Sequence, residues 1–167
     1  MNECKPAENL KKHVVQIYLL LLDLHRDSTG HVKAIRCHES ARIFCEVLRE
    51  LGFKVEVVNG GYLLSEKKGM QHSWVEFAID YYGTCLLIET VPHLFFPKLS
   101  LEELVAKMVI LPDDERWQKY CLVEDDIFSE VLKKRRIKNI DMKLVRNYSA
   151  LILRTLSKRK TKRFTNG

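Results

Sequence analysis

Three residues that could form a nucleophilic relay occur in separate segments of the chain: Cys37, His72 and Glu89. A thiol attacks a carbonyl carbon only as the thiolate, so a catalytic cysteine needs a lowered pKa. Cys37 begins a segment with the apolar spacing of a helix. Unpaired N–H groups and the positive dipole end at a helix N-terminus lower a thiol pKa, and those N–H groups can stabilise a tetrahedral oxyanion. The position of Cys37 therefore predicts a thiol nucleophile.

A base and an orienting acid are predicted in two strand-like segments downstream. His72 opens the alternating segment HSWVEFAI, and its imidazole could take the thiol proton and later protonate a leaving group. Glu89 lies in the apolar segment TCLLIETV, where a carboxylate is costly to bury without a hydrogen-bond donor. An imidazole N–H would be that donor and would fix the histidine tautomer. If the two segments pair as a hairpin, Glu89 lies opposite residues 74–76, and His72 is its diagonal neighbour.

Other histidines and cysteines near the predicted thiol offer weaker alternatives. His38 follows Cys37 directly, and adjacent residues of a helix point apart, so His38 is a poor base for that thiol. His31 is a weak candidate for a second oxyanion donor. A zinc site could be assembled by residue type from Cys37, His38, His72 and Cys85, but no ligand-pair spacing supports it. No metal and no cofactor are expected.

The remaining cysteines are interpreted as structural. Cys45 lies on the apolar stripe of the same helix, Cys85 in a strand and Cys121 in a predicted helix, whereas Cys4 lies in a start that we expect to be disordered. Five cysteines without a CxxC pair argue against a disulfide framework and favour a reducing compartment. Because the polar N-terminus also shows no secretory signal, the sequence predicts a cytoplasmic protein.

The elements that position these residues follow from apolar periodicity and from turn residues. The predicted helices span residues 8–25 and 37–51, and strands are expected at 53–58, 72–79 and 84–91. The segments NGG (59–61) and DYYG (80–83) are turn signals, and YLL (62–64) could begin a further strand. Ser100 and Glu103 form a capping box for another helix, and the chain past Pro112 is predicted to be helical.

This order of elements predicts an α+β fold, because two strands form a direct hairpin and no repeating βαβ pattern occurs. The 167 residues are long enough for one domain with a proper core. We expect a single domain over residues 1–167. Its core covers about 8–97, a C-terminal helical extension covers about 100–157, and a basic flexible tail covers about 158–167.

Charge is distributed unevenly along the chain. Residues 130–167 carry 13 Lys and Arg against 2 Asp and Glu, whereas the preceding residues carry 15 against 20. A basic end of this kind is either a solvated helix face or a surface for a polyanion such as nucleic acid. Its only aromatic residues are Tyr148 and Phe164, too few for a base-stacking platform. The apolar run at residues 14–22 is shorter than the roughly 20 residues that span a bilayer, so no membrane association is expected.

Three motifs in order resemble the transglutaminase-like superfamily of papain-fold cysteine enzymes. They are CHESARIFCEVLRELGFKVEVVNG, then HSWVEF, then LLIET, and together they lie within residues 35–92. They are similar to the helix-opening cysteine, the H-x-W-x-E segment and the strand ending in an acidic residue of that family. The resemblance implies a papain-like core in which Cys37 is the nucleophile, His72 the general base and Glu89 the orienting acid.

The resemblance also implies attack on the amide bond of a peptide or protein substrate through a thioester. Glu89 stands where the family usually has Asp, and the glutamine that often precedes the cysteine of crosslinking members is missing. No acidic loop with calcium spacing occurs, so hydrolysis is favoured over crosslinking. Arylamine N-acetyltransferases and peptide N-glycanases remain subclass alternatives. They differ from this chain by an RGG segment before the cysteine and by zinc-ligand cysteine pairs, respectively.

The alternative from another functional class is a catalytically inactive transglutaminase-like binding module. In that interpretation the basic C-terminal region binds a polyanion or a protein partner, and Cys37 lines a ligand pocket or is a relic.

Overall fold

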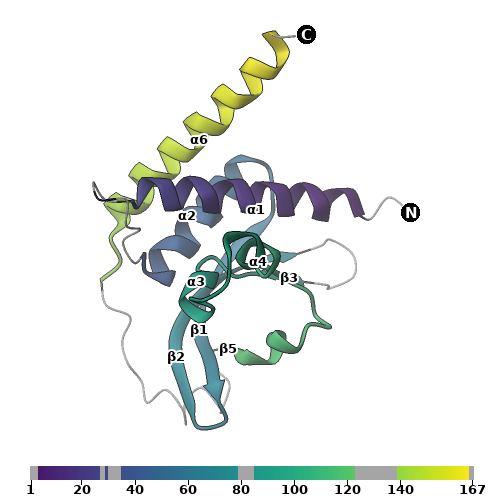
Figure 1. Cartoon of the computed structure of the whole chain (residues 1–167), viewed down its shortest axis with the longest axis vertical. Coiled ribbons are helices and arrows are strands. Elements are labelled where there is room, and N and C mark those ends of the chain that lie inside the picture. Colours follow the sequence, from purple (N-terminus) through teal and green to yellow (C-terminus); the bar gives the residue numbers. More distant parts are fainter. Residues whose placement is uncertain (1–3, 27–28, 30–34, 79–84, 123–138, 166–167) are drawn as a thin grey trace.

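The computed structural model describes residues 4–26, 29, 35–78, 85–122 and 139–165. N-terminal helices pack on a five-stranded antiparallel sheet, and a long helix ends the chain (Figure 1). The helices are α1 (Cys4–Leu24), α2 (Cys37–Glu50), α3 (Pro92–Phe95), α4 (Leu101–Ala106) and α6 (Met142–Thr165), with a 3₁₀ helix η1 (Glu115–Lys119). The strands are β1 (Val55–Ser65), β2 (Lys68–Ala78), β3 (Cys85–Ile88), β4 (Val109–Ile110) and β5 (Tyr120–Leu122). The predicted α+β class is confirmed.

A long hairpin of β1 and β2 forms the centre of the sheet, whose strand order is β4-β3-β2-β1-β5. The hairpin pairs run from Val55 opposite Phe77 to Ser65 opposite Lys68. The reversal therefore lies at residues 66–67, within the polar segment SEKKG. The predicted DYYG turn between β2 and β3 lies outside the described residues.

The predicted turn at residues 59–61 is wrong, because β1 continues through this segment. A Cβ atom at Gly60 would lie 2.2 Å from the Cys121 carbonyl oxygen and 2.6 Å from the Trp74 ring. Glycine is therefore needed there for the close approach of β5 and of an aromatic side chain, and not for a reversal of the chain.

The prediction that the chain is helical past Pro112 is wrong for β5, and Cys121 lies in that strand and not in a helix. The short strand β4 was also missed. Strands of two or three residues carry no detectable alternation, and these two form because they complete the edges of the sheet. The capping box of α4 is confirmed, since Glu103 N donates to Ser100 Oγ and Ser100 N donates to Glu103 Oε2.

Two apolar clusters cover the two faces of the sheet. The larger cluster lies between the sheet and the helices α1, α2 and α6, and its most buried members include Leu10, Ile17, Phe44, Leu48, Val75, Ile88, Val145 and Ile152. The smaller cluster contains Trp74, Leu87 and Ile110. Because successive residues of a strand point to opposite faces, Val75 faces the helices and Trp74 faces away from them. The predicted packing role of Cys45 is confirmed, as its side chain belongs to the larger cluster.

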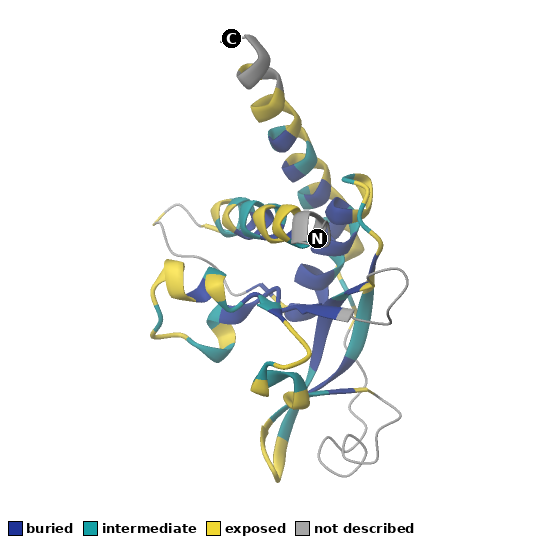
Figure 2. Cartoon of the chain, turned by 90° about the vertical axis from the view of Figure 1, so that its right-hand side faces the viewer, coloured by how far each residue is buried: buried dark blue, intermediate teal, exposed yellow. Residues whose placement is uncertain are grey.

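The last helix, α6, packs on the body through only part of its length (Figure 2). Val145, Ser149, Ile152 and Leu156 are buried, whereas residues 157–160 are all exposed. The helix continues to Thr165, through residues that the sequence assigned to a flexible tail. Among the described residues, no helix combines the length and the apolar character that a membrane span requires.

Candidate active site

Cys37 is the first residue of α2, as the sequence predicted. The first backbone bond of this helix runs from Ser40 N to Arg36 O at 3.0 Å, and the Arg36 side chain does not cap the helix. The N–H groups of residues 37–39 therefore belong to the unpaired first turn, where the helix dipole is positive. The Cys37 side chain is 7% exposed, so it lies just below the protein surface.

His72 lies on β2, opposite Gly60 of β1, and is completely buried. Its Nε2 atom lies 2.7 Å from Oε2 of Glu89. Four aromatic rings surround the imidazole, with Phe95 the nearest at 5.0 Å between centroids; the others are Tyr62, Trp74 and Tyr120. These rings exclude water from the imidazole and fix its plane.

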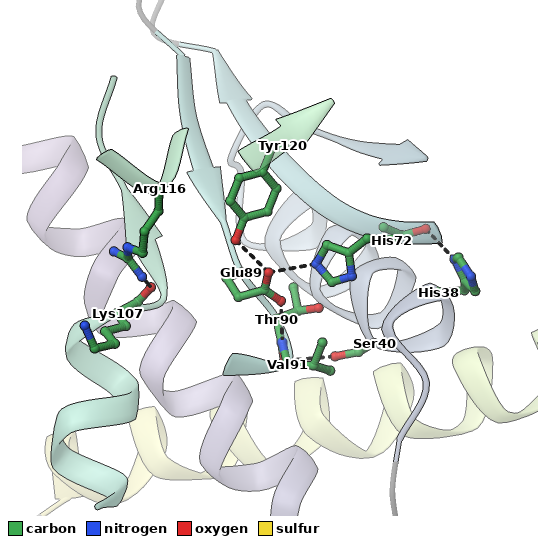
Figure 3. Close-up of polar contacts among 10 residues, drawn as sticks. His38, Ser40, His72, Glu89, Thr90, Val91, Lys107, Arg116 and Tyr120 are labelled. Atoms are coloured by element: carbon green, nitrogen blue, oxygen red, sulfur yellow. Dashed lines mark hydrogen bonds and ion pairs between the residues drawn. The ribbon is translucent and has the colours of Figure 1, made fainter. Parts of the chain in front are cut away.

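Glu89 follows the last residue of β3, and its backbone N–H donates to Met108 O at 2.7 Å. The side chain is only 2% exposed, and both carboxylate oxygens accept hydrogen bonds (Figure 3). Oε1 accepts from Val91 N at 3.0 Å, and Oε2 accepts from the Tyr120 hydroxyl at 2.7 Å as well as from His72. The buried carboxylate therefore has the donors that its burial requires.

The register of β2 and β3 accounts for this juxtaposition. Ile88 pairs with Val75, so the next residue of the chain, Glu89, reaches the level of Trp74, diagonal to His72. This agrees with the position that a hairpin predicts for these residues. The structure thus brings His72 and Glu89 together on one side of the sheet, and α2 delivers Cys37 to the same imidazole.

The Cys37 thiol has a strongly perturbed pKa. Burial raises the pKa, but polar interactions with the imidazoles of His38 and His72 outweigh it and lower the pKa to about 6. His72 Nδ1 has no hydrogen-bond partner among the described residues. The interaction of the imidazole with the thiol is therefore looser than its hydrogen bond to Glu89. Catalytic hydrogen bonds are commonly loose before substrate binds.

The pKa values of His72 and Glu89 move in the directions of a buried ion pair. Burial lowers the pKa of His72, but the Glu89 charge and the hydrogen bonds to Cys37 and Glu89 raise it to about 9. Burial raises the pKa of Glu89, but the His72 charge and the three hydrogen bonds lower it overall. At neutral pH the site therefore holds a thiolate, an imidazolium and a carboxylate.

Two residues of this site were not found from the sequence. Tyr120 lies on the three-residue strand β5, which no sequence pattern signalled. His38 was rejected because neighbours in a helix point apart, yet it contributes to the lowered pKa of Cys37. Its Nδ1 atom lies 2.5 Å from the Ser73 hydroxyl, on the residue of β2 that follows His72. The short distance between the first turn of α2 and β2 is a tertiary feature and leaves no trace in local spacing.

The other titratable residues singled out in the sequence lie elsewhere. Burial raises the pKa of Cys45, and Cys121 is buried in β5. The side chains of Cys4 and Cys85 and the whole of His31 lie outside the described residues. Within the described part of the chain, no three His, Cys, Asp or Glu side chains are arranged to hold a metal. A groove of about 590 Å³ beside Phe53 and Glu76 contains none of Cys37, His72 and Glu89.

Comparison of the chain with protein-family models, with curated proteins and with solved structures finds no match. The function of the site is therefore argued from its own geometry and chemistry.

Proposed function

We propose that the protein is a thiol enzyme of the transglutaminase-like type, which cleaves or transfers an acyl group at an amide bond. One observation carries the proposal. The His72 imidazole is hydrogen-bonded to a buried, ionised Glu89 on one side and interacts on the other with a thiol at a helix N-terminus. A nucleophile, its base and an orienting acid in this arrangement are the common basis of covalent acyl chemistry.

Acylation uses the thiolate that the site already holds. The Cys37 sulfur forms a bond to the amide carbon, and the N–H groups at the start of α2 stabilise the resulting oxyanion. The carbon–nitrogen bond then breaks, and the imidazolium of His72 gives its proton to the leaving amine. A thioester on Cys37 and a neutral His72 remain.

Deacylation runs the same proton transfer in reverse. The neutral His72 takes a proton from water, and the hydroxide adds to the thioester carbon. The carbon–sulfur bond breaks, the thiolate leaves, and a carboxylic acid is released. The thiolate and the imidazolium are thereby restored. An amine in place of water would give acyl transfer, but the missing glutamine before Cys37 favours hydrolysis of a peptide or protein amide.

Glu89 performs the part of the usual aspartate in this proposal. Its longer side chain is fixed at both oxygens, by Val91 N and by the Tyr120 hydroxyl. The carboxylate can therefore hold the Nε2–H tautomer of His72 and keep Nδ1 directed to the thiol.

Site-specific alkylation tests the proposal. Iodoacetamide should label Cys37 faster than the other four cysteines at pH 7, as mapped by mass spectrometry, because thiolate is the reactive form. The rate should rise with an apparent pKa of about 6. His72→Ala should slow labelling by about tenfold or more, since it removes a hydrogen bond and a positive charge. Equal, slow labelling of all five thiols would overturn the proposal.

A second candidate function is polyanion binding, favoured by the projecting end of α6. Lys158, Arg159 and Lys160 are exposed and follow Leu156, the last residue of α6 whose side chain is described as buried. The pKa of His13 is lowered, and burial is the largest cause. The positive charges of Lys160 on α6 and Lys12 on α1 lower it further. Positive charges of two helices therefore converge on one surface. Attraction of a phosphate backbone to such a surface is independent of Cys37 and is compatible with the thiol enzyme.

A further inference from the structure

The imidazole that would protonate the leaving amine is closed off from solvent in this structure. His72 is completely buried, and its Nδ1 atom is buried without a hydrogen-bond partner among the described residues. The neighbouring Cys37 is only 7% exposed. A leaving amine must come within hydrogen-bond distance of the nitrogen that gives it a proton. Binding of a peptide substrate therefore requires that part of the wall around this imidazole moves.

The ring of Phe95 is the part of that wall whose removal disturbs the least. Of the four aromatic rings on the imidazole, two belong to the buried strand residues Tyr62 and Trp74, and that of Tyr120 is fixed by a hydrogen bond to the acid of the triad. Phe95 is half-buried, and its ring contacts His72 edge to face at 5.0 Å between centroids. A phenyl ring forms no strong hydrogen bond, so packing alone holds it there.

Phe95 is carried by α3, which is a single helical turn of four residues. One turn has too few backbone hydrogen bonds to be stable by itself, so contacts with the rest of the protein determine its position. Before this turn, the Val91 backbone N–H donates to Glu89 Oε1 at 3.0 Å (Figure 3). This hydrogen bond can stay in place while the turn beyond it moves outward with Phe95.

A hydrogen bond between α3 and α1 holds the turn in the closed position. His93 Nδ1 lies 2.8 Å from the hydroxyl of Tyr18, a residue that is 1% exposed. The other ring nitrogen of His93, Nε2, is buried with no hydrogen-bond partner among the described residues. An unpaired buried nitrogen opposes the closed position, because opening would return it to water. The two contributions oppose each other, which keeps the free-energy difference between closed and open positions small.

We propose that α3 is a movable cover over His72, with Phe95 as the covering ring and the Tyr18–His93 hydrogen bond as its latch. The inference rests on the proposed thiol enzyme and adds the step by which a peptide enters the site. In the closed position the cover keeps water from the imidazole. A peptide that displaces Phe95 brings its leaving amine to Nδ1 of His72, and the cover closes again after the amine has left.

Deuterium exchange at the C2 atom of each histidine, measured by mass spectrometry on the full chain, tests the cover directly. The pH profile of this exchange separates the pKa of an imidazole from its access to water. Phe95→Ala deletes the covering ring. Phe96→Ala is the matched control, because Phe96 is the next residue along the chain but its ring lies under Lys107 Nζ, at 4.9 Å.

The latch is tested by a second variant in the same measurement. Tyr18→Phe removes the hydroxyl that bonds to His93 and keeps the aromatic ring. Tyr148→Phe is its matched control, because the Tyr148 hydroxyl also bonds to a histidine, with His25 Nδ1 at 3.1 Å, but on α6 and away from α3.

In Phe95→Ala the exchange rate of His72 should rise by about tenfold or more, since the packing that excludes water is lost. In Tyr18→Phe it should rise by about fivefold, because the closed position loses one hydrogen bond. Both control variants should leave the rate within about twofold of the wild type. The labelling rate of Cys37 with a bulky peptidyl chloromethyl ketone, relative to iodoacetamide, should rise in the same order, because this ratio reports access and not thiolate content.

The outcomes distinguish the cover from the proposed enzyme. A faster His72 exchange in Phe95→Ala alone would overturn the inference, because the ring would then cover the imidazole without a latch. If Tyr18→Phe accelerates exchange equally at every histidine, it has loosened the whole fold, and the separate cover is refuted. If His72 responds as expected but Cys37 is no more reactive than the other cysteines, the cover stands and the thiol enzyme fails.

Discussion

The tip of α2 and the end of α6 both concentrate charge, but the two regions treat it in opposite ways. At the tip of α2, His72 and Glu89 are buried, and these two groups lie at hydrogen-bond distance from each other. At the end of α6, which projects from the body of the protein (Figure 1), residues 157–160 are all exposed. One region contains opposite charges inside the protein, and the other contains like charges in water.

This difference determines what each region can do. Charges in a poorly solvated interior interact strongly over a few ångströms, so loss of a single atom changes protonation and reactivity. Exposed charges are screened by salt within about 8–10 Å and act through their sum. The α2 tip is thus suited to chemistry at one atom, and the end of α6 is suited to attraction of an extended anion.

The largest effect is expected from neutralising the buried acid. Glu89→Gln removes the charge that raises the pKa of His72 and leaves buried donors with a poorer acceptor. We expect labelling of Cys37 at pH 7 to fall by about tenfold or more, and the free energy of unfolding in urea to fall by about 3 kcal/mol. Glu76→Gln is the control, because Glu76 also lies on the sheet and accepts from Trp74 Nε1, outside the triad. If the two variants had equal effects, the buried carboxylate of Glu89 would be no more important to labelling and stability than the carboxylate of Glu76.

A second prediction concerns the pH dependence of stability. The pKa of His72 is raised, so its contribution is fully present below pH 6.5 and is lost as pH rises through about 9. The pKa of Cys37 is lowered from 9.0 to about 6, so its contribution is present above pH 9 and is lost as pH falls through about 6. Between these values, folding moves a proton from thiol to imidazole without net uptake.

The free energy of unfolding of the wild-type protein should therefore receive no net pH dependence from this pair between pH 6.5 and 9. In Cys37→Ser the compensating thiol is absent, and stability should fall across that range by at most about 1.4 kcal/mol per pH unit. Urea denaturation at several pH values measures how the free energy of unfolding of the wild-type protein and of Cys37→Ser changes with pH. Parallel curves for the two proteins would show that His72 and Cys37 do not share a proton.

A smaller effect is expected from the hydroxyl that holds Glu89. Tyr120→Phe deletes only the donor to Oε2, so we expect a loss of about 1 kcal/mol in stability and a labelling rate reduced by up to about tenfold. Tyr62→Phe is the matched control, because Tyr62 also packs on His72 but makes no hydrogen bond to Glu89 in the described structure. If both variants behave alike, Tyr120 contributes packing and no orientation of the acid.

The smallest effect on the fold is expected at the end of α6. Replacing Lys158, Arg159 and Lys160 by Glu should leave stability and Cys37 labelling unchanged, since surface substitutions rarely alter either. The same variant should lose binding to duplex DNA, measured by fluorescence anisotropy, and wild-type binding should weaken steeply with added salt. Binding that survives the charge reversal would exclude this surface as the polyanion site.

Sequence patterns predicted the structure correctly where the pattern lies within a single helix or strand. Apolar periodicity predicted α2 within one residue of its observed end, and the capping box located α4. Patterns failed where a residue serves a partner distant in sequence. Gly60 looked like a turn residue because sequence cannot show that Cys121 and Trp74 approach it. For the same reason Tyr120 had no visible role.

By itself, the sequence determined the residue types that the proposed acyl chemistry needs and the α+β elements that carry Cys37, His72 and Glu89, because side-chain type and periodicity are local properties. Only the tertiary structure decided that Tyr120 and Val91 hold the acid and that His38 reaches Ser73. Hydrogen bonds between strands and helix ends depend on distances of a few ångströms, and those distances are set by how the whole core packs.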